Sequence, residues 1–368
     1  MLVSVAAAVV VLSVIFLIEY RTGKMVKLLV EQQSRGEFSI QIADIDFSLF
    51  RHQLGLESVV LRQMDTSTAR TKATLQLPHL FLRINSWSHL LFEKKVEIDS
   101  VMLRAPVFET SVDTGAHRVD ISFQAAEIIK GLNKAVAVLN VRALRLEDGT
   151  LLLHTANAGP PFQIRHINVL IRNFGQAVNA GDPLHAAGEL DLEIGEQQWN
   201  INDLMIGFHR LHFNGSSQSL DMDSFRFASA AVENRSHAAG SVDRIYFESD
   251  SLSRFFESGE LILDTLLCVR PVVQVYLVAR PDSVTESTAV AEVLRNLFPD
   301  VYVHHLSVSG GQFFAESSHN GKSLTYATKQ TDLQIGDLNF RPGEDRYLTV
   351  GDIGLQLRQI TFYTPDSL

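Results

Sequence analysis

The alternation of apolar and polar residues along much of this chain restricts its fold more than any other feature. Leu190, Leu192 and Ile194 alternate with polar residues, and the same pattern recurs at 38–42, 45–49, 204–208 and 353–357. A period of two residues places apolar side chains on one face of a β-strand and polar side chains on the other. The pattern therefore predicts a mainly β protein built on an antiparallel sheet with one wet face.

Two short helices are expected to interrupt the strands. Residues 124–133 and 288–298 carry apolar residues at the i, i+3, i+4, i+7 spacing of an amphipathic helix, and Pro299 ends the second. The two segments lie about 165 residues apart, and the sequence around them repeats at a similar shift, as in a duplicated unit.

The repeat matches residues in order along both halves of the chain. Ala105-Pro106-Val107 falls on Arg270-Pro271-Val272, and further matches place Leu54 on Leu220, Ser58 on Ser224, Leu144 on Leu306 and Gly149 on Gly311. We therefore predict two β modules, residues 38–203 and 204–368. The last residues echo a segment after which the first copy continues into another strand. We therefore expect the second module to be truncated and the chain to be a fragment of a longer repetitive protein.

The first 18 residues contain no charged side chain. As a helix they would extend about 27 Å, close to the roughly 30 Å of a bilayer core. We predict a transmembrane anchor over residues 1–20 and a linker with a short helix over 21–37. A cleaved signal peptide is the alternative, but it would need a basic start and a small-x-small cleavage site. Arg21, Lys24 and Lys27 follow the segment and no cation precedes it, so the positive-inside rule places the bulk of the chain in the cytoplasm.

Charge and cysteine content exclude several classes of protein. The net charge is −10 and no basic run is present, which argues against a nucleic-acid partner, since phosphate neutralisation dominates such binding. The single cysteine, Cys268, excludes an intramolecular disulfide and a cysteine-based zinc site.

Pairs of histidines or carboxylates are the best candidates for catalysis or metal binding, and all are weak. They are His209 with His212, His304 with His305, Asp44 with Asp46, and Asp221 with Asp223. The histidines of each pair point to opposite faces of a strand, and the carboxylates fall on its polar face. No Gly-x-Ser-x-Gly or phosphate-loop motif is present. We therefore expect no catalytic residue, metal or cofactor, and a protein that is not an enzyme.

The order of motifs resembles the AsmA-like family, the AsmA/TamB/YhdP group of bacterial envelope proteins. An N-terminal anchor is followed by a strand pair ending in a turn over 85–92, a strand ending in proline over 98–106, and an h-x-G-x-h strand over 146–151. The second module repeats this order between 225 and 340.

The resemblance implies a long curved antiparallel sheet, a trough with an apolar inner face. It also implies a single-pass protein of the inner membrane whose β modules lie in the periplasm, contrary to the flanking charges. Such proteins are implicated in moving phospholipid and in outer-membrane homeostasis, so phospholipid, the inner membrane and other envelope proteins are the expected partners. An acyl chain in water costs about 0.8 kcal/mol per CH₂, which an apolar groove would remove.

The candidate groove residues lie on the strands that end in proline. They are Val96, Ile98, Val101, Leu103, Val107, Leu261, Leu263, Leu266, Cys268 and Val272. Each is also accounted for as an ordinary core residue, because a sheet needs packing wherever another layer covers it. The alternative function is a structural factor that assists outer-membrane protein assembly by β-strand pairing. An unfilled apolar trough favours lipid binding, and a filled core with a bare edge strand favours assembly.

Overall fold

The structure is a computed structural model that describes thirteen segments of the chain. They are residues 38–48, 52–63, 71–86, 98–112, 142–155, 161–172, 189–201, 204–230, 236–250, 260–278, 300–319, 322–341 and 348–363. The described residues form twenty β-strands and no helix, so none of them belongs to a helix that could cross a membrane. The expected anchor, the linker and the helices at 124–133 and 288–298 lie outside the described residues.

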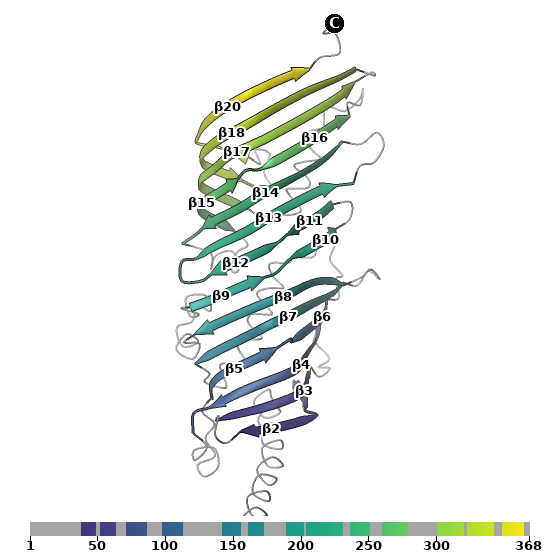
Figure 1. Cartoon of the computed structure of the whole chain (residues 1–368), viewed down its shortest axis with the longest axis vertical. Coiled ribbons are helices and arrows are strands. Elements are labelled where there is room, and N and C mark those ends of the chain that lie inside the picture. The colour runs from purple at the N-terminus through teal and green to yellow at the C-terminus, as the bar shows by residue number, and fades with distance from the viewer. Residues whose placement is uncertain are drawn as a thin grey trace, which may run out of the picture. The chain divides into compact units, whose positions relative to one another are not determined.

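The strands fall into two compact units, Met1–Leu192 and Glu193–Leu368, and the boundary lies within β9 (Glu189–Ile194). Figure 1 labels the strands along the chain. The other strands of unit 1 are β1 (Phe38–Gln41), β2 (Asp44–Ser48), β3 (Gln53–Gln63), β4 (Thr71–Ile84), β5 (Ile98–Arg104), β6 (Val107–Val112), β7 (Ala143–Thr155) and β8 (Phe162–Arg172). Those of unit 2 are β10 (Gln197–Ile201), β11 (Leu204–Phe208), β12 (Arg210–Asn214), β13 (Ser219–Ser229), β14 (His237–Glu248), β15 (Leu261–Val269), β16 (Val272–Val278), β17 (Val301–His319), β18 (Lys322–Phe340), β19 (Leu348–Thr349) and β20 (Asp352–Tyr363).

The sheet of unit 1 is mostly antiparallel, as the alternation predicts. Strands β1 and β2 pair with β3, β3 pairs with β4, and β4 pairs with both β5 and β6. The exception is β7, which runs parallel to β5 and β6 and antiparallel to β8. A parallel pair needs a crossover of a dozen or more residues, and residues 113–141 between β6 and β7 provide that length.

Unit 2 repeats this topology strand for strand, which confirms the internal repeat. Strands β11 to β18 pair as β1 to β8 do, including the parallel pairing of β17 with β15 and β16. Unit 2 also contains β10, antiparallel to β11, and β20, antiparallel to β18. The short strand β19 pairs with one end of β18.

Residues with positive φ occur at matching positions in the two units. The matched pairs are Ser58 and Ser224, Ala105 and Arg270, Asp148 and Gly310, and His166 and Gln330, with φ between 48° and 65°. Seven of these eight residues are not glycine, and positive φ is uncommon for residues other than glycine. Because the same sites recur in both units, we interpret them as bulges that belong to the module.

The backbone hydrogen bonds around these bulges also recur. In unit 1 the Ala105 N–H donates to the Glu147 carbonyl and the Thr150 N–H to the Pro106 carbonyl, both at 2.8 Å. In unit 2 the Arg270 N–H donates to Ser309 at 2.8 Å, and the Gln312 N–H donates to Pro271 at 2.7 Å. These bonds hold the junction between β5 and β6 against β7, and the junction between β15 and β16 against β17. The proline at each junction therefore marks the point where one strand ends and the next begins along the same neighbour.

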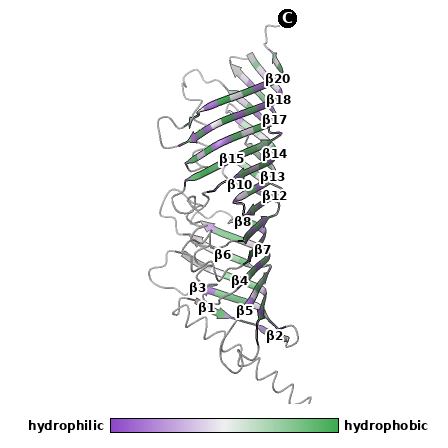
Figure 2. Cartoon of the chain, turned by 90° about the vertical axis from the view of Figure 1, so that its left-hand side faces the viewer, coloured by the Kyte–Doolittle hydropathy of each residue, from purple (hydrophilic) through white to green (hydrophobic). Residues whose placement is uncertain are grey.

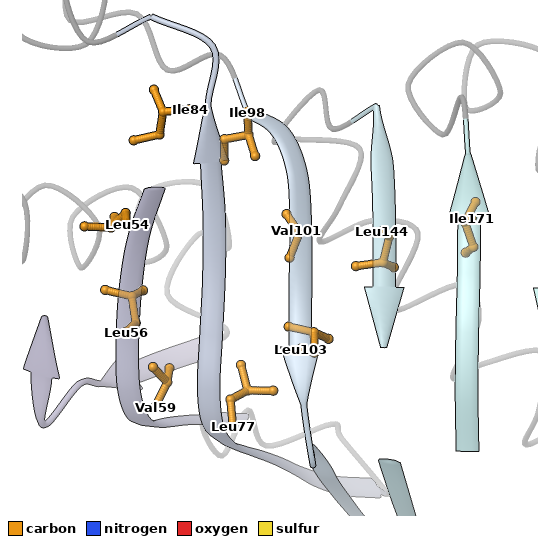
Figure 3. Packing of buried hydrophobic residues seen from close by; sticks show 10 residues of the cluster. All are labelled: Leu54, Leu56, Val59, Leu77, Ile84, Ile98, Val101, Leu103, Leu144 and Ile171. Carbon is orange, nitrogen blue, oxygen red and sulfur yellow. The ribbon is translucent and has the colours of Figure 1, made fainter. Parts of the chain in front are cut away.

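The bulges keep apolar side chains on one face of the sheet. On β3 the buried apolar side chains before Ser58 are Leu54 and Leu56, and the one beyond Ser58 is Val59. An uninterrupted strand would turn Val59 toward the other face, because successive side chains alternate. The bulge at Ser58 returns the Val59 side chain to the face of Leu54 and Leu56. Figure 3 shows the resulting buried cluster.

Candidate apolar binding face

Strand register aligns the apolar residues of unit 1 into rows that cross the sheet. Row 1 contains Leu54, Leu82, Val101, Leu144 and Ile171, and row 2 contains Ile45, Leu56, Leu80, Leu103, Leu146 and Val169. Four of the five residues of row 1 are buried, and all five belong to or pack against one hydrophobic cluster. The face of unit 1 that carries these rows is therefore a filled core.

Unit 2 has the corresponding rows at matching positions. Its row 1 contains Phe213, Leu220, Phe247, Leu266, Leu306, Ile335 and Ile353, and its row 2 contains Leu211, Met222, Ile245, Cys268, Val308, Leu333 and Leu355. None of these fourteen side chains is charged. We call the face that carries both rows the apolar face of unit 2, and Figure 2 shows hydrophobic and hydrophilic residues following one another along its strands β17, β18 and β20.

The two units differ in how deeply equivalent residues are buried. Leu144 is 2% exposed in unit 1, whereas its counterpart Leu306 is half-buried. The same contrast separates Leu54 at 2% from half-buried Leu220. On β20 the row residues are more open still, with Ile353 60% exposed. The apolar face of unit 2 therefore retains contact area for a further apolar group.

The structure brings five of the ten sequence-predicted groove residues onto these apolar faces. They are Ile98, Val101 and Leu103 in unit 1, and Leu266 and Cys268 in unit 2. Leu261 and Leu263 are level with Val301 and Val303 and belong to neither row. Ile98 and Leu263 are 4% and 3% exposed, so both are core residues. Leu266 and Cys268 are half-buried, which leaves them as the candidates best placed to contact a ligand.

Val107 and Val272 lie on the opposite face. Val107 is level with Gln76 and Thr150, while its neighbour Phe108 is level with Leu75 and Leu151. In unit 2 the equivalent Val272 is level with Ser241 and Gln312. The positive-φ residue before each proline reverses the alternation, so both valines turn away from the apolar rows. Val96 lies outside the described residues.

The opposite face of unit 2 carries ion pairs. The Arg244 guanidinium donates to both carboxylate oxygens of Asp221 at 2.6–3.1 Å, and Arg210 pairs with Asp223 at 2.8 Å. The hydrogen bonds from Arg244 lower the pKa of Asp221 below its usual value. The arrangement explains why one face of the same strands is polar and hydrated.

The polar face of unit 1 is built in the same way. Arg104 and Arg145 both approach Glu147, at 3.5 and 2.9 Å, and the Arg104 guanidinium lies 5.8 Å from the centre of the Phe81 ring. His79 stacks on Phe81 with ring centres 6.2 Å apart. These contacts place charge on the face opposite the apolar rows in both units.

Three of the paired histidines and carboxylates of the sequence lie beside side chains of opposite charge. Asp221 and Asp223 each pair with an arginine, and His304 approaches Asp337 with its Nδ1 3.4 Å from a carboxylate oxygen. The Tyr302 hydroxyl also donates to Asp337 at 2.8 Å, which lowers the pKa of Asp337. Among the described residues, no group of three histidine, cysteine or acidic side chains could hold a metal ion.

Sequence reasoning missed the continuous exposed row on β20. The sequence shows alternation only from Ile353 to Leu357, but the row continues to Ile360 and Phe362 beyond the positive-φ residue Gln359. A three-residue step between Leu357 and Ile360 was the available signal, and the same step marks the other bulges.

Comparison with known proteins adds little. No protein-family model and no curated protein matches the chain. A solved structure described as the sex pheromone staph-cAM373 precursor aligns over 93% of this chain and 92% of its own, at 9% identity and a TM-score of 0.18. At this TM-score the likeness carries no argument about fold or function.

Proposed function

We propose that the chain binds the acyl chains of phospholipids on the apolar face of unit 2. The observation that carries this proposal is the half-buried state of row residues whose counterparts in unit 1 are buried, such as Leu306 against Leu144. Each CH₂ transferred from water to such a face is stabilised by about 0.8 kcal/mol. No chemical step is required for this function.

The sequence supports a cellular setting for this proposal. The uncharged residues 1–18 suit an inner-membrane anchor, and the resemblance to the AsmA-like family suits a periplasmic protein that holds or conducts phospholipid for outer-membrane homeostasis. An apolar trough along the rows of a module would lower the cost of holding acyl chains outside a membrane.

Lipid co-purification tests the proposal. The full chain is purified, and bound phospholipid per protein is quantified by mass spectrometry for wild type, Leu266→Glu and Leu267→Glu. Leu266 lies on the apolar face, and its neighbour Leu267 is also half-buried but lies on the other face, level with Tyr246 and Ser307. We expect Leu266→Glu to lose most of the bound lipid and Leu267→Glu to retain it. Equal lipid content in wild type and Leu266→Glu, with all three proteins folded by circular dichroism, would refute the proposal.

A second candidate function is the assembly of outer-membrane proteins by β-strand pairing. The filled core of unit 1 and the long edge of β20 favour it, since strand addition needs an edge rather than an empty trough. Wild-type protein that carries no phospholipid would favour this second function over the first.

A further inference from the structure

Strand β20 forms an edge with unusual length and openness. It has 12 residues, about 40 Å of backbone, and pairs with β18 on one side. No described strand pairs with its other side. Its row residues Ile353, Leu355, Ile360 and Phe362 are 46–65% exposed.

This edge lacks the features that protect edge strands from pairing. Proteins blunt such edges with short strands, charges or proline. The segment DIGLQLRQITFY contains no proline and only two charged residues, Asp352 and Arg358. The first strands of unit 1, by contrast, are the short β1 and β2 of 4 and 5 residues, and β2 contains Asp44 and Asp46. The β20 edge is therefore open to pairing with a further strand.

The internal repeat identifies what covers it. Under the repeat, the segment β9–β10 corresponds to β20, so that Leu190 matches Ile353, Gln197 matches Ile360 and Trp199 matches Phe362. Strand β10, unlike β20, is not left as an edge strand. It pairs antiparallel with β11, the first strand of the predicted second module, and that pairing has a defined register.

The β10–β11 register fixes the expected partner of β20. Gln197 lies opposite Phe208 and Trp199 lies opposite Ile206, and the Trp199 ring meets the Phe208 ring edge-on with centres 5.6 Å apart. At the positions of Gln197 and Trp199, β20 offers Ile360 and Phe362. Cross-strand pairs of aromatic and aliphatic residues of this kind stabilise antiparallel strands.

We propose that the free edge of β20 pairs antiparallel with a strand of the β11 type, the first strand of a further β module. Ile360 lies opposite the residue that corresponds to Phe208, and Phe362 lies opposite the one that corresponds to Ile206. The partner strand is apolar at alternate positions, so that it pairs with the β20 backbone and extends the apolar face. This inference does not depend on lipid binding.

A peptide with the sequence of residues 203–214, DLMIGFHRLHFN, provides the probe. Its binding to the full chain is followed by fluorescence anisotropy for wild type, Phe362→Glu and Thr361→Glu. Both residues are exposed, but Thr361 is level with Ala327 on the opposite face, so it is the matched control. We expect wild type and Thr361→Glu to bind the peptide, and Phe362→Glu to bind at least tenfold more weakly. Absence of wild-type binding, or equal weakening by both substitutions, would overturn the proposal.

Disulfide trapping tests the register. In a Cys268→Ser background, Ile360→Cys or Thr361→Cys is oxidised with a peptide in which the residue corresponding to Phe208 is cysteine. Directly opposed residues have the Cα separation that a disulfide requires, whereas a one-residue slip turns the side chain to the other face. We expect trapping at residue 360 and little at residue 361, and the reverse preference would refute the register. A dimer of the full chain that Phe362→Glu abolishes and the peptide does not displace would assign the edge to a second copy and overturn the proposal.

Discussion

Equivalent leucines in the two units should differ sharply in what they contribute to stability. Leu144 is 2% exposed within the unit 1 cluster, so Leu144→Ala removes about three carbons from a filled core. At about 0.8 kcal/mol per buried carbon the transfer cost is about 2.4 kcal/mol, and the cavity raises the total to about 3–4 kcal/mol. Leu306 keeps part of its surface exposed, so Leu306→Ala loses a smaller share of that transfer energy and adds little cavity cost, which gives about 1.5–2 kcal/mol.

Urea unfolding followed by tryptophan fluorescence measures both effects. The chain has two tryptophans, Trp87 within the range of unit 1 and Trp199 within that of unit 2, so Trp→Phe backgrounds report one unit each. We expect each substitution to shift the midpoint of its own unit with little change in slope. If Leu306→Ala costs as much as Leu144→Ala, the face of unit 2 is as filled as that of unit 1 and has no room for an acyl chain.

Three further predictions test other parts of the structure. A Cβ at Gly240 would lie 2.8 Å from the Val272 carbonyl oxygen, whereas a Cβ at Gly354 would lie 3.8 Å from its nearest neighbour, the Gln334 Cβ. Urea unfolding should therefore show Gly240→Ala destabilised by about 1–3 kcal/mol and Gly354→Ala unchanged. The hydrogen bonds from Arg244 lower the pKa of Asp221. The ion pair therefore stabilises the fold above the ordinary aspartate pKa of 3.8, and this stabilisation is lost as the pH falls through the lowered pKa. Asp221→Asn should therefore cost up to about 1 kcal/mol at neutral pH, and urea titrations in acid should show that cost vanish. Burial raises the pKa of the Cys268 thiol, so maleimide should label this thiol slowly in the folded chain. Labelling should be slower still with phospholipid bound, and a labelling rate that phospholipid leaves unchanged would count against contact between lipid and Cys268.

The sequence was sufficient to predict the β class and the repeat, because both depend on local patterns. Alternation identifies strands such as Leu204–Phe208, and matched prolines at 106 and 271 align the two copies. Alternation fails at the bulges, where one residue in the left-handed region exchanges the two faces of the strand. Alternation wrongly predicts that Val107 and Val272 lie on the apolar face, because the exchange at Ala105 and Arg270 is not visible in residue type.

Burial was the harder quantity to predict. Leu103 and Cys268 occupy the same position in row 2 of their units, yet Leu103 is 7% exposed and Cys268 is half-buried. Strand periodicity shows which face a residue is on, but its burial depends on tertiary contacts that periodicity does not encode. The distinction between a core residue and a ligand-contacting residue therefore required the structure.

Photocrosslinking with a phospholipid that carries a diazirine on its acyl chain tests the central claim most directly. The full chain is irradiated with the bound lipid, and the modified residues are mapped by mass spectrometry. The proposed function predicts adducts at Leu266, Leu306 and Ile335 on the apolar face of unit 2, and none at their neighbours Leu267, Ser307 and Gln334 on the opposite face. Adducts divided evenly between the two sets, or confined to the opposite face, would contradict it.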